Sequence, residues 1–276
     1  MRTLVHLSDL HFGRVDPRIL TPLLAAVAAA APDLVVVSGD FTQRAQVGEF
    51  KEAAIFLAKL PQPQLLVPGN HDVPLYNLMR RWLAPLRRYR RYITHDLAPF
   101  YADEEIAVLG INTARALTFK NGRINPAQLA SITERLASCG PLVTRIVVTH
   151  HPFHTPDPAP GATPRHRVVG RAQLAMAGFL QSRVDMILSG HLHVSRVGRT
   201  DEQYPMHGRT ALLIQAGTAT STRRREEVNA FNIVRIARPE AEIACMIWDP
   251  ERLTFHQASV ERFAEKEAGW ARLTAT

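Results

Sequence analysis

Acidic residues, histidines and one asparagine recur in short motifs between residues 8 and 193. The five motifs are, in chain order, Ser8-Asp9-Leu10-His11, Gly39-Asp40, Gly69-Asn70-His71-Asp72, His150-His151 and Gly190-His191-Leu192-His193. Carboxylate, imidazole and amide oxygen together select borderline transition metals such as Mn, Fe, Zn or Co. In an extended backbone alternate residues point the same way, so both members of an Asp-x-His or a His-x-His pair can reach one site. These motifs therefore predict a metal centre.

Two features of the motifs suit a centre with two cations. A carboxylate such as Asp40 can bridge two cations about 3.5–4 Å apart, the separation that two-metal phosphatases use. Glycine precedes Asp40, Asn70 and His191, and glycine permits tight turns beside a metal. Two such cations would lower the pKa of a bridging water and neutralise charge on a phosphoryl group. The chemistry we expect is hydrolysis of a phosphoester.

Each motif follows a short apolar run that predicts a β-strand. These runs are 4–7, 34–38, 65–68, 146–149 and 186–189. Further strands are expected at 106–111, 212–215, 231–236 and 243–248, and helices at 17–30, 49–60, 126–138 and 173–181. Ligands of open α/β sheets bind outside the carboxyl ends of strands, so motifs far apart in sequence can converge there. The pattern alone favours an α/β fold with one doubly wound sheet.

The composition is that of an ordinary globular protein. Of 276 residues, 46% are hydrophobic and 21% are charged. No apolar run approaches the roughly 20 residues of a membrane span, the N-terminus lacks the pattern of a signal peptide, and Cys139 and Cys245 are too few for a disulfide framework. The cytoplasm is the expected location. The net charge of +8 favours anionic partners, namely phosphate esters, nucleic acid or acidic lipid surfaces.

The five motifs, in this order, resemble the signature of the calcineurin-like metallophosphoesterases. Within that family the chain is most similar to bacterial class III cyclic-nucleotide phosphodiesterases, on its His-Leu-Ser-Asp-Leu-His opening, its Gly-Asn-His-Asp motif and its length. The resemblance implies a four-layer fold, a β-sandwich of two mixed sheets flanked by helices, in place of one doubly wound sheet. It also implies a single domain over residues 1–276.

The resemblance further implies a role for individual residues. The implied ligands of two metal ions are Asp9, His11, Asp40, Asn70, His150, His191 and His193. Asp9, His11 and His193 would bind one ion. Asn70, His150 and His191 would bind the other, and Asp40 would bridge the two.

Two neighbouring residues are implied in catalysis. His71 would contact the substrate and protonate the leaving group, and Asp72 would orient the His71 ring. A histidine suits this role because it titrates near neutrality. His151 is interpreted as a supporting or packing residue, and His6 as a structural one.

Residues 73–101 interrupt the strand–helix pattern and are expected to form a basic helical cap insertion. Within residues 76–92, six arginines are interspersed with three tyrosines and one tryptophan. Three interpretations stay open: a solvated helix with its aromatic side chains turned inward, a cap that gathers anionic substrate, and a helix on a membrane surface. Pro85 would interrupt any such helix.

The expected function is hydrolysis of a small anionic phosphodiester, foremost a 3′,5′-cyclic nucleotide, by metal-activated hydroxide. One alternative is a pyrophosphohydrolase that acts on a lipid-linked nucleotide, as in lipid A synthesis. A nuclease ranks lower, because no added nucleic-acid-binding module is recognisable. A scaffold that has lost catalysis is disfavoured, because every ligand position is filled. A homodimer and membrane contact through residues 76–92 stay open.

Overall fold

The protein is built on two β-sheets, seen here in a computed structural model that describes residues 1–276 apart from 77, 117–120, 156–167, 205–208, 223–227 and 274–276. The first sheet contains β1 (Arg2–Leu7), β2 (Leu34–Val37), β3 (Gln64–Leu66), β10 (Ala230–Ala237), β11 (Glu240–Asp249), β12 (Thr254–Lys266) and β13 (Gly269–Arg272). Its strand order is β13-β12-β11-β10-β1-β2-β3. Strands β1, β2 and β3 are parallel, whereas β10 to β13 form antiparallel pairs.

The second sheet is also mixed. It contains β4 (Phe100–Ala102), β5 (Ile106–Ile111), β6 (Thr144–Thr149), β7 (Met186–Ser189), β8 (Arg196–Arg199) and β9 (Leu212–Gln215). Its order is β4-β5-β6-β7-β9-β8. The four central strands are parallel, and the two edge strands are antiparallel to their neighbours.

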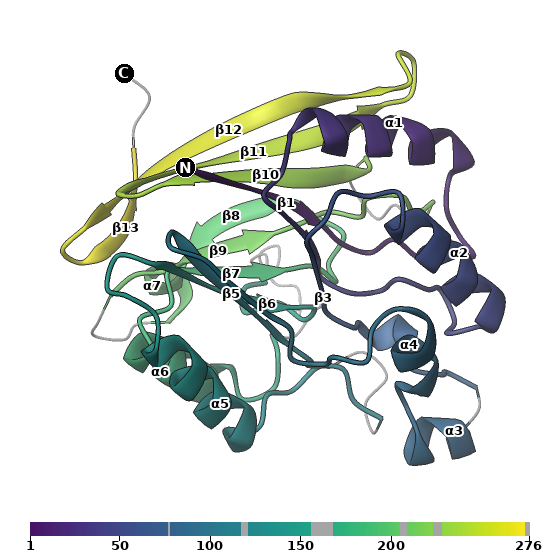
Figure 1. Ribbon diagram of the computed structural model, residues 1–276, viewed down its shortest axis with the longest axis horizontal. Helices are drawn as coiled ribbons and strands as arrows, with labels where there is room; N and C mark the ends of the chain where they lie inside the picture. Colours follow the sequence, from purple (N-terminus) through teal and green to yellow (C-terminus); the bar gives the residue numbers. More distant parts are fainter. Residues whose placement is uncertain (77, 117–120, 156–167, 205–208, 223–227, 274–276) are drawn as a thin grey trace, which may run out of the picture.

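Helices cover the outer faces of both sheets (Figure 1). The helices beside the first sheet are α1 (Pro17–Ala29), α2 (Val47–Leu57) and α4 (Arg87–Tyr92), and those on the second are α5 (Pro126–Ala137) and α6 (Ala172–Gln181). The short elements are η1 (Asn70–Asp72), α3 (Leu78–Leu83) and α7 (Thr200–Gln203). The result is the four-layer arrangement that the family resemblance implied.

The alternation of side chains along β2 explains why this strand is apolar throughout. Val35 and Val37 pack in the core under α1 and α2. Leu34 and Val36 face the second sheet and join the core between the two sheets. A strand buried on both faces needs apolar residues at every position. The same division recurs in β6, whose alternate residues enter the inter-sheet core and the core under α5 and α6.

The expectation of one doubly wound sheet, drawn from the strand pattern alone, is wrong. The parallel strands divide into two sheets, and the antiparallel strands β10 to β13 extend the first sheet beyond β1. The β-sandwich implied by the resemblance is confirmed. Within the described ranges, no helix has the length and apolar character needed to cross a membrane.

Candidate metal centre

The five motifs lie on the loops that follow β1, β2, β3, β6 and β7, where they converge at one end of the sandwich. Of the ten non-glycine residues with positive φ in the described chain, five are expected ligands: Asp9 (53°), His11 (51°), Asp40 (54°), His191 (74°) and His193 (62°). Such left-handed conformations are costly for these residue types and gather at functional sites. The backbone of these loops is therefore shaped to direct side chains inward.

Three of the expected ligands form the first cluster. Nε2 of His193 lies 3.1 Å from Oδ1 of Asp9, and Nε2 of His11 lies 3.5 Å from the same oxygen. The two imidazole nitrogens are themselves 3.1 Å apart. All three residues are buried. This is the group that was expected to hold one metal.

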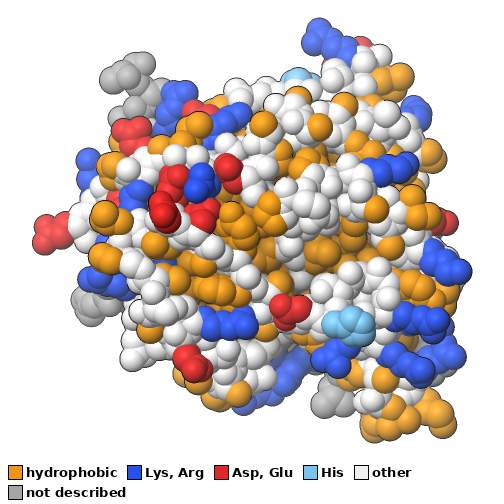
Figure 2. Space-filling view, in the orientation of Figure 1, with side chains coloured by type: hydrophobic (Ala, Val, Ile, Leu, Met, Phe, Trp, Pro, Cys, Tyr) orange, Lys and Arg blue, Asp and Glu red, His pale blue; other side chains and the backbone are white. Residues whose placement is uncertain are grey.

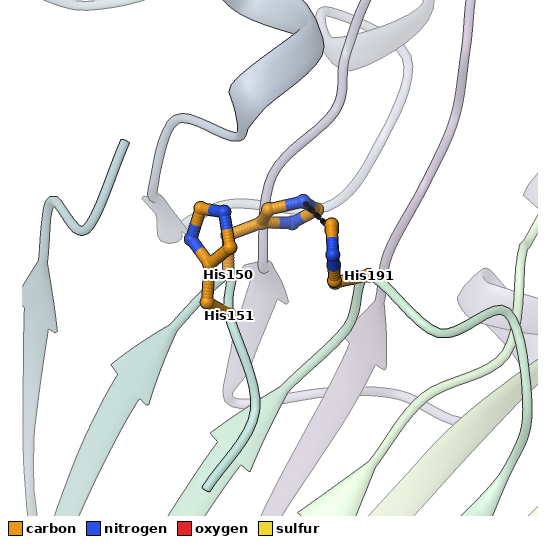
Figure 3. Close-up of side chains that lie close together, drawn as sticks. All are labelled: His150, His151 and His191. Atoms are coloured by element: carbon orange, nitrogen blue, oxygen red, sulfur yellow. Dashed lines mark hydrogen bonds between the residues drawn. The ribbon is translucent and has the colours of Figure 1, made fainter. Parts of the chain in front are cut away.

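The second cluster surrounds His150. Its Nε2 lies 3.1 Å from Oδ1 of Asn70 and 3.2 Å from Nδ1 of His191, and Figure 3 shows the rings of His150 and His191 brought together from two neighbouring strand ends. Nδ1 of His150 is 2.7 Å from the Ser38 carbonyl oxygen. Because this main-chain acceptor holds Nδ1, the ring presents Nε2 to the cluster.

Asp40 lies between the two clusters. Its Oδ2 is 3.7 Å from Nε2 of His11 and 3.4 Å from Nε2 of His150. Asp40 is buried, with 1% of its surface exposed. One carboxylate oxygen thus faces a nitrogen of each cluster, which is the position that a bridging ligand needs.

The chemistry of these donor atoms fits a cation. Oδ1 of Asp9 is buried and faces the ring nitrogens of His11 and His193. Burial raises the pKa of Asp40, but His150 and His71 hold it below its ordinary value. Burial lowers the pKa of His150, but the Asp40 carboxylate raises it to about 9 overall. Positive charge at the centre therefore stabilises the buried Asp40 carboxylate. A metal ion can supply that charge in place of a proton.

Close packing of the loops requires glycine at the centre. Gly39 has φ +98°, and a Cβ there would lie 2.5 Å from Nδ1 of His150. A Cβ at Gly190 would overlap Oγ of Ser8. That Ser8 hydroxyl donates a hydrogen bond of 2.6 Å to Oδ2 of Asp9. The glycines thus let neighbouring loops approach closely enough to bring their ligands together.

A family model described as calcineurin-like phosphoesterase matches residues 2–195. The matched segment contains all five motifs and more than half of the chain. The chain belongs to the calcineurin-like phosphoesterase family. It is accordingly a metal-dependent hydrolase, in a family that uses a dimetal site. A search of curated proteins found none that matches.

The fold is similar to that of solved structures. Purple acid phosphatase PPD1 from yellow lupin (Lupinus luteus) superposes with a TM-score of 0.66 over 93% of this chain, at 11% identity. This chain spans about half of that protein, 52% of its length. The phosphopantetheinyl hydrolase PptH of Mycobacterium tuberculosis has a TM-score of 0.47 and 16% identity, covering 78% of this chain and 89% of that one. At these identities the likeness concerns the fold.

His71 lies beside His11 of the first cluster and beside Asp40 in this phosphoesterase. One of its ring nitrogens is within 4.8 Å of ligand atoms of His11 and Asp40, and the His71 and His11 rings meet edge to face, 4.9 Å apart. Nδ1 of His71 is 2.7 Å from the carbonyl oxygen of Gln43. If Nδ1 donates that bond, the neutral ring carries a lone pair on Nε2.

Asp72, which was expected to orient the His71 ring, contacts the main chain of two ligand loops. Asp72 accepts main-chain hydrogen bonds from Phe41, Thr42 and Gly69, at 3.3, 3.0 and 2.9 Å. Burial and the neighbouring Asp40 carboxylate raise its pKa to about 7. Asp72 therefore joins two ligand loops, and the Gln43 carbonyl orients the ring.

His151 is a further imidazole at the centre (Figure 3). A ring nitrogen of His151 lies within 4.8 Å of nitrogens of His150 and His191, and the His151 and His191 ring centroids are 4.8 Å apart. Nδ1 of His151 is 2.8 Å from the Thr113 hydroxyl. The hydroxyl of Thr113 thus holds the ring of His151, the residue that was expected to have a supporting or packing role. His6 is structural, as expected: it bonds Ser38 at 2.8 Å.

Sequence reasoning missed the loop after β9. The hydroxyls of Thr218 and Thr220 donate to the carbonyl oxygens of Asp9 and Leu10, at 2.7 and 2.5 Å. These bonds hold the first ligand loop in its left-handed conformation. Residues 216–221 contain no charged residue and no histidine. In the sequence, therefore, only the apolar run 212–215 before them indicated that this loop follows a strand of the sheet.

Arg115, Arg123 and Arg171 lie close to one another, and the main chain of Arg123 contacts Thr113, the partner of His151. The N–H of Arg123 donates to the Thr113 carbonyl at 3.1 Å, and Arg123 pairs with Gly170, next to Arg171. Burial lowers the pKa of Arg115, and the charges of Arg123 and Arg171 lower it further. Among the described residues, none of the three forms an ion pair with a carboxylate. Within the described residues, the three arginines therefore form a group of like charges, joined to His151 through Thr113.

The basic segment 76–92 forms two short helices, α3 and α4, instead of one. Tyr89 of α4 is fully buried against Phe41, and Tyr92 stacks on Phe50. Tyr76 and Trp82, in contrast, are 74% and 69% exposed. The interpretation with all aromatic side chains turned inward thus holds for α4 and is wrong for α3.

Proposed function

We propose that the protein hydrolyses a phosphodiester with metal-activated hydroxide. The observation that carries the proposal is the position of Asp40 Oδ2 between His11 and His150, each within a separate cluster of donor atoms. Asp9, His11 and His193 would hold one ion, Asn70, His150 and His191 the other, with Asp40 shared. Two cations held in this way activate water and neutralise phosphoryl charge.

The chain itself supplies proton transfer and positioning. We assign His71 as the general acid, since its ring lies against His11 and its Nδ1 is held by Gln43. With Nδ1–H donating to the Gln43 carbonyl, the ring can act as an acid only in its imidazolium form, which also carries a proton on Nε2. Transfer of that Nε2 proton to the leaving oxygen, which leaves the ring neutral, would contribute about 10²–10⁴ in rate. His151, whose Nδ1 lies 2.8 Å from the Thr113 hydroxyl, lies beside the second cluster.

The first substrate that we propose is a 3′,5′-cyclic nucleotide or a similarly small phosphodiester. Its support is the similarity of the motifs to class III cyclic-nucleotide phosphodiesterases. Such a substrate carries one negative charge, which the metal centre alone would balance.

A second candidate is a pyrophosphohydrolase acting on a lipid-linked nucleotide, and two observations favour it. Arg115, Arg123 and Arg171, which form no ion pair with a carboxylate of the described residues, offer positive charge for a second phosphate. The segment 73–101, which we regard as a cap beside the site, carries apolar side chains exposed to solvent on α3. Neither feature is needed for a cyclic nucleotide.

A substrate panel with added Mn²⁺ separates these candidates. The panel contains 2′,3′- and 3′,5′-cyclic nucleotides, glycerophosphodiesters, nucleoside-diphosphate lipids and DNA. Turnover of the 3′,5′-cyclic nucleotides well above the rest supports the first candidate. Selective turnover of the nucleoside-diphosphate lipid supports the second, and selective turnover of DNA would contradict both.

A further inference from the structure

Helix α3 exposes its apolar face to solvent, whereas an ordinary surface helix buries it. Met79, Trp82 and Leu83 are spaced i, i+3, i+4 and so lie on one helix face. They are 75%, 69% and 81% exposed. Tyr76, just before the helix, is 74% exposed. Large apolar side chains gathered on one exposed face mark an interaction surface, whereas isolated ones are common.

The side of α3 that faces the protein carries an arginine. Arg81 is 1% exposed. Its guanidinium donates to the carbonyl oxygens of Ala116 at 2.5 Å, Pro74 at 3.0 Å and Arg115 at 3.4 Å. This polar anchor fixes which way the helix faces, because turning the apolar face inward would remove the guanidinium from these acceptors. The exposure of the apolar face is thus built into the packing.

The charge around this face has one sign. Between Asp72 and Asp96 the sequence has six arginines and no acidic residue. Arg80, Arg87, Arg90 and Arg91 are exposed, while Arg88 bonds the carbonyl oxygen of Ala45 at 2.6 Å. Figure 2 shows the hydrophobic side chains over α3 at the lower right, with Lys and Arg side chains beside them. An apolar face beside arginines complements a surface that is apolar beneath an anionic layer.

We propose that α3 docks the protein on an anionic lipid bilayer, with Tyr76, Met79, Trp82 and Leu83 entering the interface and the exposed arginines of α3 and α4 contacting lipid phosphates. Tyrosine and tryptophan suit this depth, since each has an apolar ring and a polar group. The segment leaves η1 directly, through Val73 and Pro74. Docking there would bring the catalytic centre close to the membrane plane. The proposal does not depend on which phosphodiester is hydrolysed.

Tryptophan fluorescence tests this proposal on the full chain. The sequence has three tryptophans, and Trp248 and Trp270 are each 1% exposed. A change in emission on adding vesicles therefore reports Trp82. We expect a blue shift with vesicles of equal parts phosphatidylcholine and phosphatidylglycerol, and a much weaker one with phosphatidylcholine alone. An unchanged emission spectrum with the anionic vesicles would overturn the proposal.

Paired variants separate docking from general surface effects. The double variant Met79→Ser, Leu83→Ser keeps the reporter Trp82 and should lose most vesicle binding. The matched control Ile55→Ser, Leu142→Ser removes apolar groups that are 61% and 76% exposed elsewhere, and should bind as the wild type does. Equal binding by both double variants would contradict the assignment of α3.

The charge contribution is tested in the same way. Replacing Arg87, Arg90 and Arg91 by Gln should weaken vesicle binding by roughly fivefold per arginine. A triple control carries the same change at Arg183, Arg252 and Arg262. A soluble aryl phosphodiester should be hydrolysed at wild-type rate by all variants, so a failure of docking is distinct from a failure of the proposed reaction. A blue shift that depends on protein concentration without vesicles would instead place a second copy of the chain on this face.

Discussion

Oδ1 of Asp40 accepts a hydrogen bond of 2.8 Å from the main-chain N–H of His71. The other oxygen of the same carboxylate faces His11 and His150. One side chain therefore sets the position of the candidate general acid and occupies the space between the two ligand clusters. Metal binding and proton transfer are expected to respond together when it is changed.

Asp40→Ala should be the most damaging single ligand change. It removes a ligand proposed for both ions and the acceptor for the His71 N–H, so metal content should fall and turnover should drop by more than roughly 100-fold. Metal analysis and steady-state kinetics measure both. Asp16→Ala is the control: Asp16 is buried and caps α1, so its loss should cost about 1 kcal/mol of stability without loss of metal. Full metal content and turnover in Asp40→Ala would refute the bridge.

His71→Ala tests proton transfer. With a poor alkoxide leaving group, kcat should fall by about 10²–10⁴-fold, because departure of that oxygen needs a proton. With a nitrophenyl ester the loss should be much smaller, and metal content should stay near that of the wild type. Equal losses on both substrates, with metal retained, would assign His71 to charge stabilisation instead.

Gly39→Ala tests the close approach of the ligand loops. The added Cβ would meet the His150 ring at a residue with φ +98°, so both Tm and activity should fall. The matched change Gly48→Ala places a Cβ in α2 where nothing lies within 4 Å. It should raise stability by about 0.5 kcal/mol, since alanine favours a helix over glycine. Similar Tm values for the two variants would contradict this packing argument.

Arg123→Gln tests the charge beside His151. For a substrate with a second phosphate, KM should rise roughly tenfold, as expected for loss of a charged hydrogen bond, and the effect should shrink as salt rises. For an aryl phosphodiester with one charge, KM should change little. Arg183→Gln, an exposed arginine on the loop after α6, is the control. A uniform effect on both substrates would argue against a second phosphate site.

Much of the strand pattern could be predicted because the central strands are buried on both faces. The bounds of β5, β7 and β9 match the expected runs 106–111, 186–189 and 212–215. β12 was missed, because most of its residues are exposed and its sequence mixes charged with apolar residues. The division into two sheets follows from tertiary pairing, which periodicity alone does not encode.

At the site, spacing located the residues but not every contact. The motifs brought His150, His191 and their partners to one place, as the strand-end rule predicts. The main-chain contacts of Asp72 with Phe41, Thr42 and Gly69 could not be predicted from its adjacency to His71 in the sequence. The sequence left three interpretations of residues 76–92 open, because periodicity does not show that Arg81 is the buried residue of α3.

The central claim is that a two-metal centre performs the hydrolysis, and metal content measured together with turnover tests it most directly. Purified protein should carry close to two transition-metal equivalents per chain. Removal by a chelator should abolish turnover of an aryl phosphodiester, and Mn²⁺ should restore it. Full turnover by protein shown to be free of metal would contradict the account.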